Sequence, residues 1–187
     1  MKKNMLLALA AFTASTSAFA HPGHGLESGF AAGLMHPLTG WDHLLVMVAL
    51  GIWAARRPAA QGWQLPVLFV SVMALAASAA MTWLPVSLAE ALVAASVVIM
   101  GVLLISPLQM PRALQISVIS IAAAAHGYVH GMEIGNQWSG LAGMVLATAM
   151  LHALGWVLGR QTHPQLQKAT QLLGGVMLGL GAMWMLA

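Results

Sequence analysis

The chain has 187 residues, of which 60% are hydrophobic and only 6% are charged. Soluble domains carry about 25% charged residues, so this composition excludes a soluble protein and indicates one embedded in a membrane. The net charge of +3 comes from Lys and Arg residues that are spread along the whole chain, so they form no basic patch for nucleic acid.

The first twenty residues are predicted to be a secretory signal peptide that is cleaved. Lys2 and Lys3 precede an apolar stretch over residues 5–12, and Ala18-Phe19-Ala20 has the small residues of a cleavage site. An uncleaved first anchor is the alternative, but the apolar stretch is too short to cross a bilayer comfortably. Cleavage after Ala20 makes residue 21 the N-terminus of the mature protein and places it in the periplasm.

Residues 21–28 are predicted to form a short periplasmic arm. The arm begins His21-Pro22-Gly23-His24-Gly25, which is too rich in Gly and Pro to be helical. His21 and His24 are candidate metal ligands, and we hypothesise that they capture an ion and deliver it to the membrane domain. A disordered tail without such a role is the alternative.

Residues 29–187 are predicted to form an all-α membrane domain with six transmembrane helices. A short apolar segment over residues 27–35 comes first, and Pro37 disfavours helical geometry at His36, so a half-helix and then a break are expected. Each of the following apolar stretches has about the 20 residues that a membrane crossing needs. These stretches cover residues 37–55, 64–84, 86–106, 112–132, 138–159 and 168–187.

The basic residues predict how this domain is oriented in the bacterial inner membrane. If the first span runs inward from the periplasm, no Lys or Arg falls in a periplasmic connection, which is what the positive-inside rule requires. Both ends of the mature chain then lie outside. The residues at the cytoplasmic ends are Arg56, Arg57, Arg112, Arg160 and Lys168.

Two polar patches interrupt the apolar spans near their predicted outer ends. An aspartate at the centre of a membrane helix costs about 2.5 to 3.5 kcal/mol on insertion scales, so such residues indicate a function. Residues 126, 130 and 133 fall within an arc of roughly 60° on a helix and can face one partner. The candidate site residues are His36, Asp42 and His43 in the first patch, His126, His130 and Glu133 in the second, and Glu90 in the outer third of its own span.

Four imidazoles and three carboxylates at one depth are the composition of a site for a divalent transition metal. Cysteine is absent, so thiolate zinc sites and iron–sulfur clusters are excluded, and imidazole nitrogens suit Ni, Co, Cu and Zn. A structural polar network is the alternative for these residues. His152, alone in the fifth span, is interpreted as a packing residue, with a later position on a metal pathway as the alternative.

The motifs that carry these residues resemble the HupE/UreJ family of nickel and cobalt permeases. The resemblance lies in His-Pro-Gly-His after the signal peptide, HPLTGWDHLLVM over residues 36–47 and AHGYVHGME over residues 125–133, and it covers essentially the whole chain. It implies secondary uptake of Ni²⁺ or Co²⁺ as the transported ion, with no permanent cofactor, often for hydrogenase or urease assembly. It also implies that the two patches described above carry the permease signature, and it does not distinguish nickel from cobalt.

Other functions remain open for the same residues. His43 and His130 are a possible pair of haem ligands in a membrane b-type cytochrome, although Asp42 and Glu133 beside them suit a hydrated cation better. A copper carrier is a second alternative. An intramembrane zinc hydrolase would need a segment such as H-E-x-x-H, and G-x-x-x-x-G-K-[ST] is also absent, so neither an enzyme nor an ATP-driven pump is expected. The expected partners are the metal ion and the lipid bilayer, and the oligomeric state is left open.

Overall fold

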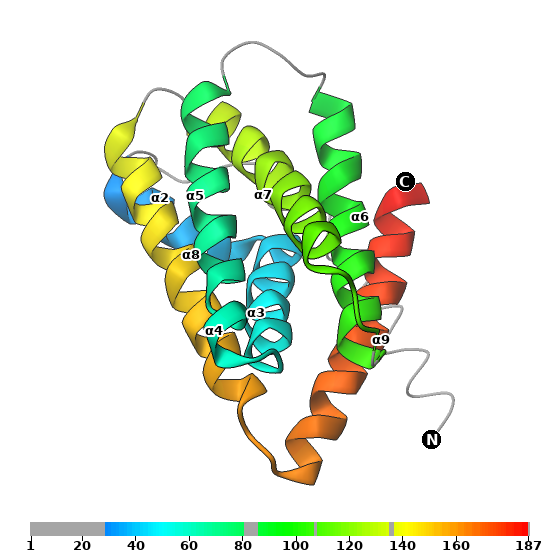
Figure 1. Cartoon of the computed structure of the whole chain (residues 1–187). Coiled ribbons are helices and arrows are strands. Elements are labelled where there is room, and N and C mark those ends of the chain that lie inside the picture. The colour runs from blue at the N-terminus through cyan, green and yellow to red at the C-terminus, as the bar shows by residue number, and fades with distance from the viewer. Residues whose placement is uncertain (1–28, 81–85, 107, 135–136, 187) are drawn as a thin grey trace.

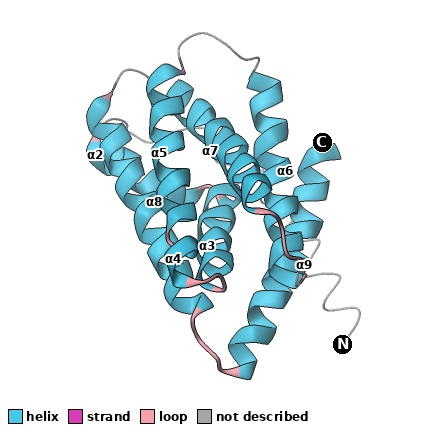
Figure 2. Ribbon diagram, viewed as in Figure 1, coloured by secondary structure: helices cyan, strands magenta, loops and turns pink. Residues whose placement is uncertain are grey.

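The computed structural model describes residues 29–80, 86–106, 108–134 and 137–186, and these residues form helices joined by short connections (Figure 2). No strand occurs in this part of the chain, which confirms the all-α prediction there. The signal peptide and the arm with His21 and His24 lie outside the described residues. The helices are α2 (Phe30–Thr39), α3 (Trp41–Ala55), α4 (Ala59–Gly62), α5 (Gln64–Ala79), α6 (Val86–Ile105), α7 (Arg112–Ile134), α8 (Trp138–Gly159) and α9 (Pro164–Leu186).

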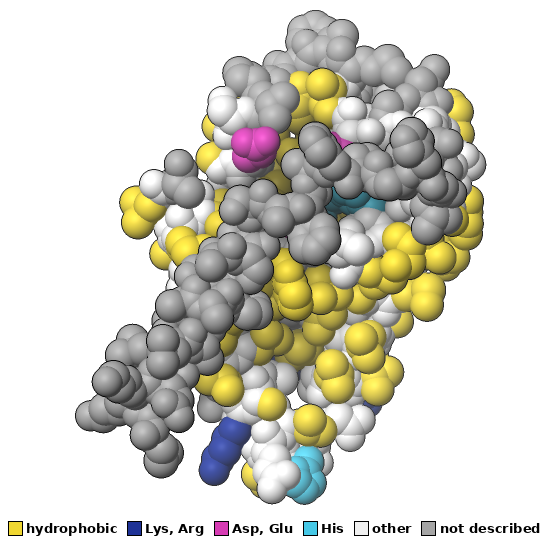
Figure 3. Space-filling view, turned by 180° about the vertical axis from the view of Figure 1, so that it is seen from behind, with side chains coloured by type: hydrophobic (Ala, Val, Ile, Leu, Met, Phe, Trp, Pro, Cys, Tyr) yellow, Lys and Arg dark blue, Asp and Glu magenta, His cyan; other side chains and the backbone are white. Residues whose placement is uncertain are grey.

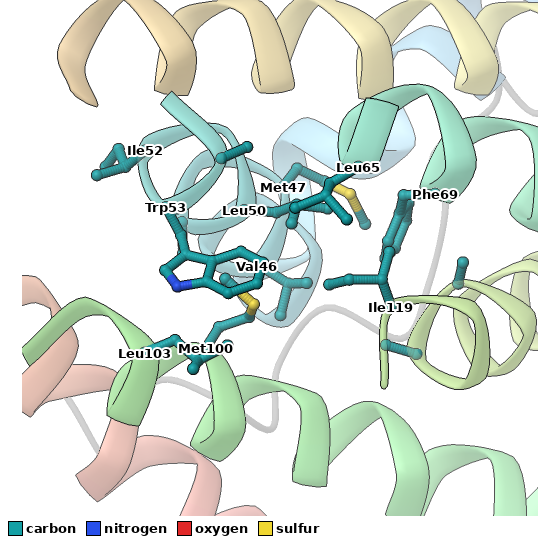
Figure 4. Packing of buried hydrophobic residues seen from close by; sticks show 14 of the residues in the cluster. Val46, Met47, Leu50, Ile52, Trp53, Leu65, Phe69, Met100, Leu103 and Ile119 are labelled. Atoms are coloured by element: carbon teal, nitrogen blue, oxygen red, sulfur yellow. The ribbon is translucent and has the colours of Figure 1, made fainter. Parts of the chain in front are cut away.

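The long helices alternate in direction, and α3 lies at the centre of the bundle (Figure 1). It contacts α5, α6, α8 and α9, while α5 packs along α7 and α6 packs along α9. Val46, Met47, Leu50 and Trp53 of α3 are all buried in the core that these helices enclose (Figure 4). This central position of α3 brings its first turn, which carries Asp42 and His43, into the interior of the protein.

The described chain is a multi-pass membrane protein. Four helical segments in it are long and apolar enough to cross a membrane, and a fifth is added if the bent pair α2 and α3 counts as one span. Apolar side chains form broad areas on the described part of the face in Figure 3, as expected for contact with lipid. Helix α7 is 23 residues long but more polar, so the sixth span stays a prediction. The four segments are Ala59–Ala79, Ser87–Ile105, Trp138–Gly159 and Pro164–Leu186.

The break before the first long span lies at Gly40, where α2 and α3 meet at an angle of 81°. The predicted position, before Pro37, is wrong. Pro37 lies inside α2, and the helix continues past it because the Gly40 N–H and the Thr39 hydroxyl both donate to the His36 carbonyl oxygen, at 3.2 and 3.0 Å. Gly40 then adopts an extended backbone, with φ −81° and ψ 112°, which ends the helix.

The last helix begins four residues earlier than predicted, at Pro164 rather than at residue 168. Proline is tolerated in the first turn of a helix because the N–H that it lacks has no partner there. His163, just before this helix, is exposed and accepts a hydrogen bond at Nδ1 from the Gln165 N–H, at 3.3 Å. This hydrogen bond gives a partner to one of the backbone N–H groups that have none within the first turn of α9.

The basic residues of the described chain gather at one end of the bundle, which we call the basic end. They lie where α3 and α8 end and where α7 and α9 begin. The end of α8 and the start of α9 are at the bottom of Figure 1. Arg56 ties three helices together there, because its guanidinium donates to the Leu104 carbonyl oxygen of α6 at 3.0 Å and to the Thr170 hydroxyl of α9 at 2.6 Å. Figure 3 shows acidic side chains toward the opposite end.

Glycine allows α3 and α8 to pack with their backbones in contact. A Cβ on Gly155 of α8 would collide with the Val48 carbonyl oxygen and would lie 3.0 Å from the Gly51 Cα of α3. Close approach through small residues is the usual basis of helix association in lipid, where no hydrophobic force drives helices together. The position of α3 relative to α8 therefore depends on these glycines.

Candidate metal centre

Five of the six residues of the two polar patches contact one another where α2, α3 and α7 meet, and Asp42 joins them through its neighbour His43. The ring centroid of His43 lies 3.8 Å from that of His130 and 4.4 Å from that of His126. The ring of His36 lies 4.5 Å from that of His130. Residues that are about ninety positions apart in the sequence thus form one cluster.

Asp42 orients His43. Its Oδ1 lies 2.9 Å from the Nδ1 of His43 and also accepts a hydrogen bond from the His43 backbone N–H, at 2.9 Å. An ionised carboxylate only accepts hydrogen bonds, so the His43 Nδ1 carries the hydrogen and the Nε2 carries the lone pair. A Cβ on Gly40 would lie 3.1 Å from Asp42 Oδ1 and 3.2 Å from His43 Nδ1, so the absence of a side chain there leaves room for this pair.

Glu133 orients two histidines with a single oxygen. Its Oε2 lies 2.9 Å from the Nε2 of His36 and 3.1 Å from the Nδ1 of His130. By the same reasoning the Nε2 of His130 carries a lone pair, and this nitrogen is buried. His36 and Glu133 are partly exposed, with 35% and 49% of their side chains accessible, so they lie at the mouth of the cluster.

Ser96 of α6 orients the third buried histidine, His126. The Ser96 hydroxyl donates its one hydrogen to the Val93 carbonyl oxygen at 2.6 Å, and its oxygen lies 3.0 Å from the Nε2 of His126. The hydroxyl must therefore accept from Nε2–H, which leaves the lone pair of His126 on Nδ1. The sequence analysis did not identify Ser96, because a serine in an apolar helix usually bonds only to its own backbone.

Three buried nitrogen atoms with free lone pairs result from these contacts. They are His43 Nε2, His126 Nδ1 and His130 Nε2, and none of them has a hydrogen-bond partner among the described residues. We call His43, His126 and His130 the buried trio, because one ring nitrogen of each lies within 4.8 Å of one from each of the others. Buried polar atoms without partners are costly, and neutral imidazole nitrogens are good ligands for divalent transition metals.

A second set of ligands lies toward the exposed side of the trio. His36, His130 and Glu133, which we call the outer group, also offer ligand atoms within 4.8 Å of one another. His130 belongs to both sets. The carboxylates of Asp42 and Glu133 add two negative charges to neutral imidazoles, so a divalent cation makes the combined site neutral, which reduces the cost of burying its charge.

Local packing turns the histidines of α7 toward α3. Gly127 and Gly131 lie against the backbone of α5, where a Cβ would collide with the carbonyl oxygens of Met73 and Ala77. This close contact fixes the rotation of α7 about its own axis. His126 and His130, each one residue earlier and four residues apart, are consequently held at the buried face beside α3.

The other candidates lie apart from this cluster. Glu90 lies near the start of α6, as predicted, but it is exposed and belongs to neither the trio nor the outer group. His152 of α8 is buried but is not part of either set. His21 and His24 precede the described residues.

Replacing Ser96 with alanine tests the orienting contact. Without the hydroxyl, the His126 Nε2–H loses its acceptor and Nδ1 is no longer favoured to carry the lone pair, so we expect the affinity for nickel to fall by about 10- to 100-fold. Equilibrium dialysis of the purified protein measures this affinity. Ser78→Ala is the matched control, because the exposed Ser78 hydroxyl of α5 donates to the Ala74 carbonyl oxygen and contacts no histidine of the described chain. Equal affinities of the two variants would contradict the assignment.

The ring contacts favour a metal ion over haem. A haem held by His43 and His130 would have to enter between two rings whose centroids are 3.8 Å apart. The two ligand sets offer imidazole nitrogens and a carboxylate oxygen, and Met73 Sδ accepts a hydrogen bond from the Thr148 hydroxyl at 3.7 Å. A nitrogen and oxygen donor set suits a divalent ion better than monovalent copper, which prefers sulfur ligands.

Comparison with known proteins adds independent information. The chain matches the family described as HupE / UreJ protein over residues 8–184, a range that includes both polar patches. It is 36% identical over 150 residues to the protein HupE of Rhizobium leguminosarum bv. viciae, and the alignment covers 79% of this chain and 78% of that protein. No solved structure matches the chain.

Proposed function

The chain belongs to the HupE/UreJ family, and from that premise we propose that it is a secondary permease that takes up Ni²⁺ or Co²⁺ across the bacterial inner membrane. The observation that carries the proposal is the buried trio, in which three oriented imidazoles hold free lone pairs inside a membrane protein. Three protein ligands leave other coordination positions open, which suits an ion that must be released.

The shared residue His130 supports a route from the outer group into the trio. An ion first held by His36 and Glu133 at the partly exposed mouth is already beside the ring of His130. Moving to the buried side of that ring brings it to His43 and His126 without crossing an apolar barrier. The carboxylate of Glu133 attracts the cation at the mouth, and its charge still balances the ion in the trio.

The membrane potential suffices to drive uptake. Moving a divalent cation inward across about 100 mV releases about 2 × 2.3, or roughly 4.6 kcal/mol. Each tenfold concentration ratio costs about 1.4 kcal/mol, so accumulation of about three decades needs no ATP. We therefore propose transport and not catalysis as the role of this chain.

The predicted orientation completes the proposal. With the basic end in the cytoplasm, the positive-inside rule is obeyed and the outer group opens to the periplasm. We propose that residues 1–20 are a cleaved signal peptide and that His21 and His24 lie on the same side as the outer group. The imported metal would serve the assembly of an enzyme such as hydrogenase or urease.

Uptake of radioactive nickel and cobalt by cells that carry this chain tests the function. Accumulation that depends on the chain and collapses when the membrane potential is removed supports a secondary permease. Unlabelled nickel, cobalt, copper and zinc, added as competitors, identify the preferred ion. Cells that contain the inserted protein and accumulate neither metal would refute the proposal.

Uptake is expected to weaken as the external pH falls. Each histidine of the trio binds metal through a neutral ring, and protonation of the ring removes the lone pair. Protons therefore compete with the metal for these nitrogens, and the competition strengthens as the pH falls from about 7.5 to about 5.5. Initial rates at a fixed concentration of free nickel measure the effect, and a flat profile would contradict ligation by histidine.

A further inference from the structure

His152 of α8 shares the bonding pattern of the buried trio although it lies outside it. Its ring is only 2% exposed, and its Nδ1 lies 2.7 Å from the backbone carbonyl oxygen of Met47. A carbonyl oxygen only accepts, so Nδ1 carries the hydrogen and Nε2 carries the lone pair. This Nε2 is buried and has no partner, like the free nitrogens of the trio.

The ring of Phe69 contacts both His152 and His126 of the trio. Its centroid is 5.6 Å from that of His126 and 5.3 Å from that of His152, with the rings edge to face in both contacts. Phe69 is fully buried on α5 within the core shown in Figure 4. One aromatic ring therefore connects His126 of the trio with His152 of α8 by direct contacts.

We propose that His152 is an inner station for the transported divalent cation, which reaches its Nε2 from the buried trio by passing the ring of Phe69. This proposal rests on the proposed function, because it assigns a second position on the same route. The chain direction agrees with it, since α8 runs from Trp138 toward the basic end and His152 lies in the second half of the helix.

The surroundings of His152 suit brief occupancy rather than storage. The trio has two carboxylates beside it, whereas His152 bonds through Nδ1 to the uncharged backbone carbonyl of Met47. Fewer charges of opposite sign make the ion less stable there. A weaker second position is what an ion needs in order to leave the trio and continue inward.

The variant His152→Asn separates a ligand from a packing residue. The asparagine amide nitrogen takes the place of Nδ1 and keeps a donor for the Met47 carbonyl, while Nε2 is lost. The protein is reconstituted into vesicles of phosphatidylethanolamine and phosphatidylglycerol, and the initial rate of radioactive nickel uptake is measured. In parallel, equilibrium dialysis measures nickel held by the trio. The matched control is His163→Asn, which changes an exposed histidine near the start of α9.

We expect His152→Asn to lower the uptake rate by at least about tenfold while the affinity of the trio changes by less than about twofold. Uptake equal to that of the wild-type protein would overturn the inner station and leave the permease intact. Loss of both uptake and nickel binding would also overturn it, because His152 would then act by supporting the trio. A wild-type protein that moves no nickel would refute the proposed function itself.

Discussion

Replacing His130 with alanine is expected to lower the affinity for nickel by about 100-fold or more and to abolish uptake. His130 is the one residue that belongs to both the outer group and the buried trio. Its loss removes one of three buried nitrogen ligands and also leaves Glu133 without one of its two imidazole donors. Removing a ligand should lower the affinity for nickel by more than the 10- to 100-fold that is typical when a residue that only orients a ligand is removed. Uptake of radioactive nickel and equilibrium dialysis measure the two quantities.

His163→Ala is the control for this variant, because His163 is exposed and belongs to neither ligand set. The control should bind and transport nickel like the wild-type protein. Both variants must be shown to be present in the membrane at the same level, so that a loss of uptake reports on the site. An His130→Ala protein that still binds nickel with wild-type affinity would remove the basis of the proposed metal centre.

Replacing Gly155 with alanine is expected to destabilise the protein by about 1–3 kcal/mol, the usual cost of overpacking a tight interior. The added methyl group would collide with the Val48 carbonyl oxygen, so α3 would have to move away from α8. Helix α3 carries Asp42 and His43, so the same shift would disturb the buried trio and lower its affinity for nickel. Thermal unfolding of the purified protein in detergent measures the first effect.

Gly175→Ala provides the matched control, because a Cβ at this position of α9 has nothing within 4 Å. Alanine is favoured over glycine in a helix by roughly 0.5–1 kcal/mol, so this variant should be as stable as the wild-type protein or more so. If the two substitutions had the same effect on unfolding, the close contact between α3 and α8 would not determine the stability of the bundle.

Much of the fold follows from local properties of the sequence. Apolar stretches of about 20 residues predict long helices, and the helices over residues 86–105, 112–134 and 138–159 lie where they were predicted. Two predicted helix boundaries were wrong, the end of α2 and the start of α9, and both lie at or near a proline. Pro37 was expected to end helical geometry but lies inside α2, and the last helix was expected at residue 168 but begins at Pro164, in a first turn where the missing N–H of proline costs little.

The candidate site was predictable only as a set of residues. Ionisable side chains are costly within apolar spans, so the sequence by itself singled out both polar patches, and the family resemblance rests on the same motifs. It also grouped Glu90 with them because of its depth along a helix, and the structure leaves Glu90 exposed and apart. Depth follows from position in the chain, whereas the direction that a side chain faces depends on how each helix packs.

Only the tertiary structure decided which atoms are available to bind a metal. The contacts of Ser96 with His126, of Glu133 with His36 and His130, and of Met47 with His152 join different helices or different turns, and they determine which imidazole nitrogen keeps its lone pair. Helical periodicity states which residues share a face, but the faces that meet depend on the close glycine contacts between α3 and α8 and between α5 and α7. The sequence therefore determined the chemistry of the ligands, and the packing of the helices determined their geometry.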